Sequence, residues 1–355
     1  MRPASLALQD RLLPGVSRTF ALTIPQLPQG LRPAITNAYL LCRIADTVED
    51  STAMAPAEKD AHYRRLLAGL DDEAAAREFA AALLATGLVQ DPLGAELIKQ
   101  TPGVLRAFSE LPASQQAALR ACVTTMCRGM AEFERLKNPH GLPDGGSLRD
   151  YCYVVAGCVG EMLTELFADS QPRIDAQREE LRRLSVAFGQ GLQMTNILKD
   201  VWDDRQRGIC WLPRDVFAER GVDLAQTPAW HEQPGYRDGI RFLVAVAHHH
   251  LQLAQAYTLR LPASEVGIRR FCSWSIGMAL ATLRKIAAHP GYTAGAQVKI
   301  SRRHLRLIVA TNNLAVGSDP LLRGVFALGR ARLPCAAPYE LGLLQAACGT
   351  PDAGS

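Results

Sequence analysis

Apolar residues recur along most of this chain at the three- and four-residue spacing of an amphipathic α-helix. Proline and glycine separate these segments, and the β-branched runs typical of strands are scarce. The pattern predicts helices over 31–49, 56–84, 114–137, 148–168, 174–205, 237–259, 264–288 and 305–311, with Ser114 and Ser147 as N-caps. We therefore expect an all-α protein, one domain over residues 1–355 whose helices surround a central cavity. Its core should span about 12–314, followed by a helical tail over 315–355.

Two acidic clusters, at residues 46–50 and 200–204, each follow a segment that is apolar almost all round. Each holds two aspartates four residues apart, which share one face of a helix. Buried carboxylates repel one another unless a cation neutralises them, and their hard oxygens suit Mg²⁺, which also binds phosphate. Either cluster alone would indicate a solvated surface, but both together favour a cavity that binds diphosphates through magnesium. The candidate metal ligands are Asp46, Glu49, Asp50, Asn196, Asp200 and Asp204.

Several polar residues near these clusters are candidates for binding the diphosphate. Gln193 and Asn196 share a helical stripe with Asp200. Basic residues lie close in sequence, namely Arg43, Lys199, Arg205 and Arg207. For Arg205 and Arg207 a surface position is an equal alternative. The run Ser17-Arg18-Thr19-Phe20 offers hydroxyls and a forked guanidinium for phosphate, and its alternative is an ordinary helix cap.

Residues 151–160 combine two tyrosines with small residues in a segment predicted to be helical. Glycine costs about 0.5–1 kcal/mol relative to alanine inside a helix, so Gly157 and Gly160 should serve a purpose. They allow either close helix packing or room for a long apolar ligand. Tyr151 lies one turn before Val155, which would project its hydroxyl into the same space. A basic run at 298–304 is either a phosphate contact or surface.

Composition narrows the class of protein further. The net charge is +4, from 39 basic and 35 acidic residues, which argues against a nucleic-acid tail and fits an anionic substrate or acidic membrane surface. Nine cysteines without a C-x-x-C pair indicate reduced thiols in a cytosolic protein. No apolar signal core begins the chain and no run of 18 apolar residues occurs, so no membrane span is expected.

With these residues together, the chain resembles the squalene/phytoene synthase family from about Leu12 to Asn313. The resemblance is carried by residues 17–20, 46–50, 151–160, 193–204, 271–272 with 279–283, and 298–300. It implies an isoprenoid-synthase-type helical bundle with two aspartate-rich helices across a deep apolar cavity. It also implies head-to-head joining of two farnesyl diphosphates to presqualene diphosphate with Mg²⁺, then NADPH-dependent rearrangement to squalene.

The resemblance also implies individual roles. Asp46, Asp50, Asp200 and Asp204 would bind magnesium diphosphate with support from Gln193 and Asn196. Ser17, Arg18, Thr19 and Arg43 would contact diphosphate, and Ser17, Arg18, Asn196, Lys299 and Arg302 would contact NADPH. Tyr151 would assist ionisation or proton removal. Substrate would also contact Phe20, Val155, Ala156, Gly160 and Lys199.

Three departures from the family pattern bear on this interpretation. Lys199 stands where arginine is usual and loses bidentate geometry. Ser275-Ile276 replaces a Pro-Gln pair common in eukaryotic squalene synthases, which weakens the assignment within the family. No C-terminal membrane anchor is evident, so we expect a cytoplasmic monomer or weak homodimer with at most peripheral contact with the inner membrane.

Three alternatives remain open. The nearest is a phytoene or dehydrosqualene synthase, a transferase that needs no reductant. A non-catalytic helical assembly factor should have lost an acidic cluster, and here both are intact. A magnesium-dependent prenyl-diphosphate hydrolase or cyclase would not account for the blocks around Tyr151 and Lys299.

Overall fold

The computed structural model describes residues 4–17, 19–226 and 229–336, and these form an all-helical single domain. Within that part of the chain no strand occurs beyond an isolated bridge between Leu142 and Pro213. The α-helices are α1 (Ala4–Val16), α2 (Phe20–Thr23), α3 (Arg32–Glu49), α4 (Pro56–Ala68), α5 (Glu73–Ala85), α6 (Pro92–Lys99), α7 (Thr101–Ser109), α8 (Ala113–Phe133), α9 (Gly145–Cys152), α10 (Cys158–Ser170), α11 (Pro172–Asp175), α12 (Arg178–Gln206), α13 (Arg214–Ala218), α14 (Pro234–Arg260), α15 (Val266–Ala288), α16 (Gly295–Val298), α17 (Arg302–Ala315) and α18 (Asp319–Arg330). The all-α prediction is confirmed.

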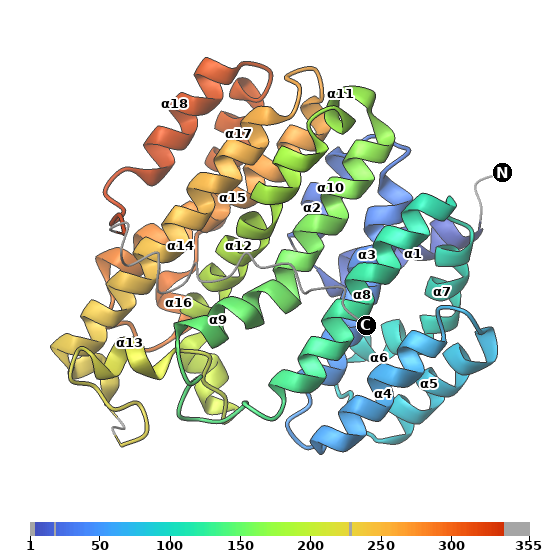
Figure 1. Ribbon diagram of the computed structural model, residues 1–355, viewed down its shortest axis with the longest axis horizontal. Helices are drawn as coiled ribbons and strands as arrows, with labels where there is room; N and C mark the ends of the chain where they lie inside the picture. Colours follow the sequence, from blue (N-terminus) through green and yellow to red (C-terminus); the bar gives the residue numbers. More distant parts are fainter. Residues whose placement is uncertain (1–3, 18, 227–228, 337–355) are drawn as a thin grey trace, which may run out of the picture.

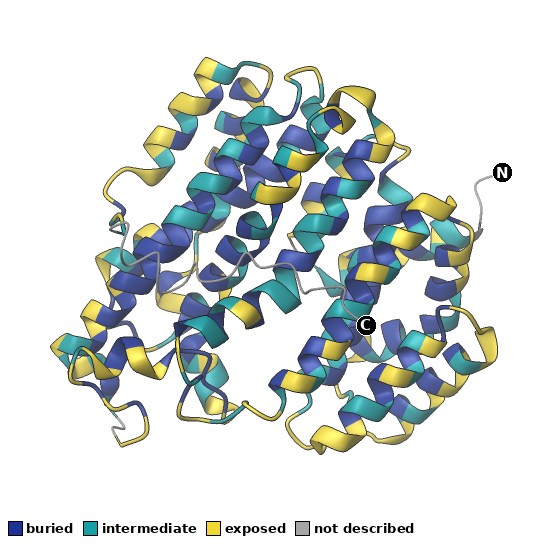
Figure 2. Cartoon of the chain, viewed as in Figure 1, coloured by how far each residue is buried: buried dark blue, intermediate teal, exposed yellow. Residues whose placement is uncertain are grey.

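Helix α12 lies at the centre of the bundle. Figure 1 shows α12, α14 and α15 running side by side, with α10 on the other flank of α12. The N-terminal helices α3 and α8 continue the bundle beyond α10, where α4 packs against α8, and α5 packs against α4 and α7. Facing sides of these helices are buried and their outer sides exposed (Figure 2).

The helix predicted over 56–84 is two helices. α4 ends at Ala68, with Gly69 as its C-cap. α5 begins after Asp72, whose side chain accepts a hydrogen bond from the Ala74 amide. An aspartate N-cap accepts a hydrogen bond from a first-turn amide that has no partner within the helix, so Asp72 marks the start of a new helix.

Both predicted serine N-caps are wrong. α8 begins at Ala113 after Pro112, and the Ser114 hydroxyl donates to Asp169. α9 begins at Gly145, and Asp144 rather than Ser147 caps it by accepting from the Ser147 amide at 2.7 Å.

The segment between α9 and α10 departs from α-helix. Tyr153–Gly157 forms a π-helical turn, a local widening that is frequent at functional sites. A Cβ atom at Gly160 would lie 2.1 Å from the Ser185 carbonyl oxygen, and one at Gly189 would lie 2.0 Å from that of Ala156. The glycines are therefore required by the close approach of α12 to this segment.

The combined stretch Gly145–Ser170 is the one helix, among the described residues, long and apolar enough to cross a membrane by length and composition. In this protein 61% of its apolar window is buried in the bundle.

Candidate active site

A cavity of about 890 Å³ opens between α3, α10, α12 and α15. Its volume lies in the upper part of the range for ligand pockets, about 300–1,000 Å³. Aromatic and aliphatic side chains line much of it, among them Phe20, Met126, Leu163, Phe167, Phe188 and Phe271. The sequence-predicted residues that line the same cavity are Thr19, Phe20, Arg43, Asp46, Val155, Ala156, Gly160, Gln193, Asn196, Lys199, Asp200 and Lys299.

Other predicted residues do not line this cavity. The Ser17 hydroxyl accepts a hydrogen bond from the Phe20 amide at 2.9 Å, as a helix cap does. Arg302 is exposed at the first position of α17. The predicted role of Arg18 falls on a residue outside the described part of the chain. Four further candidates are absent from the lining and pair with other side chains. Tyr151 bonds to Glu49, and Arg207 pairs with Asp50 and Asp204.

The two acidic clusters meet through one arginine. Arg207 places one nitrogen 3.2 Å from a carboxylate oxygen of Asp50 on the C-terminal end of α3. A second nitrogen lies 3.1 Å from Asp204 on α12. Asp46 and Asp200 precede these residues by one helical turn and line the cavity. The acidic ends of α3 and α12 therefore lie close together on either side of Arg207, an arrangement that the family resemblance implied.

Two basic residues that line the cavity, Arg43 and Lys199, pair with carboxylates of the acidic clusters. Arg43 contacts Asp50 at 3.4 Å, and Lys199 contacts Asp200 at 3.0 Å. Lys199 also donates to the Asn196 side-chain oxygen at 3.3 Å. Gly295 of α16 packs against these residues, since a Cβ atom there would lie 3.0 Å from the Lys199 carbonyl oxygen and 3.6 Å from the Asp200 carboxylate.

Burial perturbs the carboxylates on α3 strongly. Desolvation raises the pKa of Asp46 to about 8 and that of Glu49 to about 7, and neighbouring carboxylates add to the shift in both. On α12, desolvation raises the pKa of Asp204 to about 6, against the opposing charge of Arg207. Negative charge is therefore costly here unless a cation offsets it.

A buried polar network holds the end of α3. Lys59 and Lys137 each donate to the Glu49 carbonyl oxygen, at 2.7 and 2.8 Å. Both ammonium groups also lie 2.9 Å from one carboxylate oxygen of Glu134. Since the C-terminal end of a helix carries partial negative charge, two lysines stabilise it.

Tyr151 belongs to this network rather than to the cavity wall. Its hydroxyl donates to the Glu49 carboxylate at 3.1 Å, and its ring stacks on Trp211 with centroids 3.8 Å apart. The prediction that its hydroxyl projects into the space beside Val155 is wrong, because Val155 lies in the π-helical turn, where the α-helical spacing fails.

Comparison with known proteins agrees with this geometry. The family model for squalene/phytoene synthase matches residues 13–304. The chain belongs to the squalene/phytoene synthase family. Squalene synthase BSS of Botryococcus braunii is 33% identical over 219 residues, covering 59% of this chain and 44% of the relative. Squalene synthase ERG9 of Gibberella zeae is 27% identical over 287 residues, covering 79% and 58%.

The fold also matches solved structures. TcSQS in complex with the ligand BPH1237 superposes with a TM-score of 0.72 at 24% identity, covering 96% of this chain and 97% of that one. The chain thus has the squalene synthase-type fold, but it spans only about half the length of the first curated relatives, 44% and 58%.

The donor set of this family member suits magnesium. No group of three or more histidine, cysteine, aspartate or glutamate side chains within the described ranges is placed to hold a metal ion. Mg²⁺ needs no such cage, because it commonly binds one or two carboxylates and takes its remaining ligands from water and phosphate. Asp46 and Asp200, which both line the cavity, fit that mode. Burial disfavours the negative charge of Asp46, and a bound cation would offset it.

Asp203 and Tyr39 are two of the cavity residues that the sequence analysis missed. Asp203 lines the cavity, whereas Asp204 turns toward Arg207. Tyr39 lines it too, and its hydroxyl donates to the Val16 carbonyl at 2.9 Å. The signal for Tyr39 was present, because residues 39, 43, 46 and 50 share one helical stripe.

Of the two arginines weighed equally from sequence, only Arg207 joins the acidic helices. The Arg205 guanidinium instead lies 3.6 Å from the Trp230 ring centroid, a cation–π contact.

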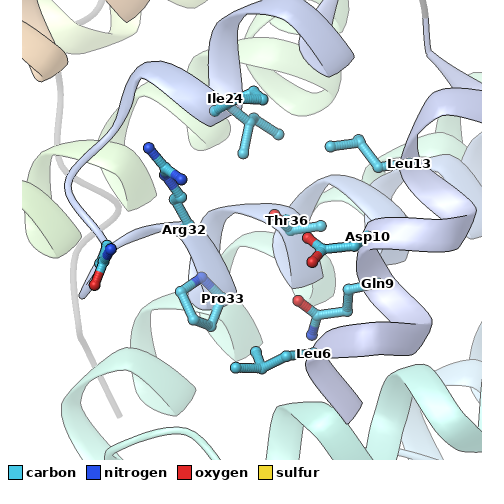
Figure 3. A pocket seen from close by; sticks show the side chains of 10 residues that line it. Leu6, Gln9, Asp10, Leu13, Ile24, Arg32, Pro33 and Thr36 are labelled. Carbon is cyan, nitrogen blue, oxygen red and sulfur yellow. The ribbon is translucent and has the colours of Figure 1, made fainter. Parts of the chain in front are cut away.

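A second cavity, of about 600 Å³, lies on the other side of Ile24, which lines both. Figure 3 shows Gln9 and Asp10 from α1 facing Arg32 and Pro33 from α3 across it. It contains none of the sequence-predicted site residues. The catalytic candidates that line a cavity, Arg43, Asp46 and Asp200, therefore all line the larger one.

Proposed function

We propose that this protein is a prenyltransferase that joins two farnesyl diphosphates head to head, forming presqualene diphosphate, and then reduces that product to squalene. The observation that carries the proposal is that Asp46 on α3 and Asp200 on α12 line one mainly apolar cavity. Paired carboxylates from two helices fit magnesium diphosphate, and the apolar remainder fits prenyl chains.

The polar end of the cavity would bind the leaving group. Diphosphate departs only when its charge is neutralised, and bound magnesium would supply most of that neutralisation as a Lewis acid. Asp46, Asp200 and Asp203 would hold the metal, while Arg43 and Lys199 would donate hydrogen bonds to the diphosphate oxygens. These cations already lie beside the carboxylates, so little reorganisation is required.

The apolar walls would protect the carbocation. When the C1–O bond of one substrate breaks, the allylic cation must attack the second substrate's double bond before water quenches it. Phe20, Tyr39 and Phe188 line this region and exclude water. An aromatic face also attracts a cation. Closing the cyclopropane releases a proton, for which departed diphosphate is the acceptor.

Reduction would use NADPH at the same cavity. Asn196 and Lys299 line it and are the residues left to contact the cofactor, since Ser17 and Arg302 lie outside its lining. A cytoplasmic location would fit the free cysteines, since thiols stay reduced in that compartment.

The second candidate is a dehydrosqualene or phytoene synthase, which needs no reductant. Ser275 favours it, because this residue lines the cavity where eukaryotic squalene synthases commonly have a Pro-Gln pair.

The test is incubation of purified protein with farnesyl diphosphate and Mg²⁺, with and without NADPH, followed by product analysis. Squalene with NADPH and presqualene diphosphate without it is the expected result. A C30 dehydrosqualene in both reactions would establish the second candidate. Failure to couple farnesyl or geranylgeranyl diphosphate would refute both.

A further inference from the structure

Four leucines stand exposed on the two C-terminal helices. Leu307 and Leu314 of α17 are 60% and 82% exposed, and Leu321 and Leu328 of α18 are 58% and 74% exposed. Across the described residues no other large apolar side chain exceeds 53%. Leucines this exposed in a group mark a surface that contacts something.

The leucines are not the packing face of these helices. α17 buries Ile308, Asn312 and Ala315, and α18 buries Leu322 and Phe326. α17 and α18 pack against each other and against α15 at one edge of the molecule (Figure 1). The leucine-bearing sides therefore face outward.

Charge on the same helices is nearly all positive. Residues 301–336 contain six arginines and a single acidic residue, Asp319. Asp319 is already paired with the buried Arg269 of α15. Arg303, Arg306, Arg323, Arg330 and Arg332 are exposed. On α17, Arg303 shares a helical stripe with Leu307 and Leu314, and Arg306 borders that stripe. The arginines of α18 lie across that helix from Leu321 and Leu328. Exposed leucines bordered by arginines, as on α17, match the interface of an anionic bilayer.

A second copy of the chain fits this surface poorly. Two copies meeting there would bring Arg303 and Arg306 of each copy into one interface, and the single acidic residue of these helices, Asp319, is already paired. Like charges brought together and desolvated oppose association. Arginine at a bilayer instead extends its head to the lipid phosphates while its stem lies along apolar surface.

We propose that the exposed face of α17 and α18 docks on an anionic lipid bilayer. α17 lies against the cavity wall: Ile308 fills the space above Gly277 of α15, and the neighbouring Met278 and Ala279 line the cavity. Docking would hold the cavity close to the membrane. The proposal rests on this surface and does not require the proposed reaction.

The test is co-sedimentation of the purified protein with phosphatidylcholine vesicles with and without phosphatidylglycerol. Binding to the anionic vesicles is expected, with a large decrease in 1 M salt. The double variant Leu314→Ser, Leu328→Ser should lose at least about tenfold in partition coefficient, and Arg303→Gln with Arg306→Gln should weaken binding to the anionic vesicles. Leu93→Ser, on α6 and 53% exposed, is the matched control and should bind normally.

Circular dichroism establishes that each variant is folded. Absent binding of the wild type, or equal binding of the leucine variant and the control, would overturn the proposal. So would a dimer in sedimentation velocity that the leucine variant abolishes, since the face would then bind a second copy. Vesicle binding without prenyltransferase activity would count against the proposed function alone.

Discussion

The two acidic helix ends have similar sequences and different surroundings. The end of α3 is held from behind by buried Lys59 and Lys137, which both bind the Glu49 carbonyl. The end of α12 has only partly exposed cations, Lys199 and Arg207. Burial accordingly raises the pKa of Asp46 to about 8, against about 6 for Asp204. Equal spacing of carboxylates therefore does not give them equal charge.

The difference in pKa suggests that the carboxylates on α3 and on α12 carry different charges before a metal binds. With pKa values of about 8 and about 6, Asp46 would hold its proton near pH 7 in the absence of metal, whereas Asp204 would be mostly ionised. We expect Asp46 to release that proton when a cation binds. The α12 cluster provides the standing charge that attracts it.

Removing a cavity-lining carboxylate should have the largest effect. Asp46→Asn and Asp200→Asn should each lower turnover of farnesyl diphosphate at least about 100-fold, as expected for groups that stabilise developing charge. Product formation at saturating Mg²⁺ is the measurement. Asp238→Asn, an exposed partner of Arg241, should be normal. Near-normal turnover in either site variant would mean that the two helices do not act together.

Removing one lysine behind α3 should destabilise the fold. Lys137→Met leaves Glu134 and the Glu49 carbonyl with one buried partner each, which costs about 3–5 kcal/mol. Lys199→Met, the counterpart on α12, should cost under about 1 kcal/mol because its ion pair is partly exposed. Urea denaturation measures both free energies of unfolding. Equal losses of stability in the two variants would show that the lysines behind α3 are no more important to the fold than Lys199 on α12.

Tyr151→Phe separates positioning from chemistry. The Tyr151 hydroxyl donates a hydrogen bond to the Glu49 carboxylate and so lowers its pKa. Losing a hydrogen bond to a charged group costs about 1.5–3 kcal/mol, and this loss would make the charged form of Glu49, a candidate metal ligand, less favourable. The Mg²⁺ concentration for half-maximal turnover should therefore rise about tenfold. The maximal rate at saturating Mg²⁺ should change little. A collapse of that rate with unchanged Mg²⁺ dependence would instead give Tyr151 the direct role in ionisation or proton transfer that the family resemblance implies.

Without metal, stability should fall as pH rises. A carboxyl whose pKa rises on folding binds more protons in the folded than in the unfolded state between the two values, so the free energy of unfolding decreases with pH. For Asp46 this window runs from about 4 to about 8. Urea midpoints in EDTA at pH 5, 6.5 and 8 should decline, and Asp46→Asn should flatten the upper half. A midpoint that rises with pH would contradict these assignments.

Arg207→Gln should have the smallest effect on stability. Arg207 and Asp50 are each more than 40% exposed, so losing the bridge should cost under about 1 kcal/mol. The pKa of Asp204 should rise, because Arg207 opposes its upward shift. Chemical denaturation together with the pH profile of Mg²⁺-dependent turnover would detect both. A loss above 2 kcal/mol would make the arginine part of the core.

The features predicted from sequence were those with local signals. Helical periodicity predicted α3 to within one residue of its start, and the i, i+4 aspartates identified both facing helices. The hydrogen bond from Lys137 to the Glu49 carbonyl oxygen has no local sequence signal, because the two residues are 88 positions apart. The break at Gly69–Asp72 was predictable from its glycine and aspartate, but the apolar pattern continues across it and concealed it.

The contact between α12 and the π-helical segment limits how this cavity can evolve. Gly160 and Gly189 meet backbone atoms rather than side chains, so any added carbon would separate the helices instead of shortening the cavity. In the proposed reaction, the length of the prenyl chain would therefore be selected by residues such as Phe20, Met162 and Phe188, which also line the cavity. One wall of the cavity is fixed by the close approach of two backbones, and the other walls are free to change its depth.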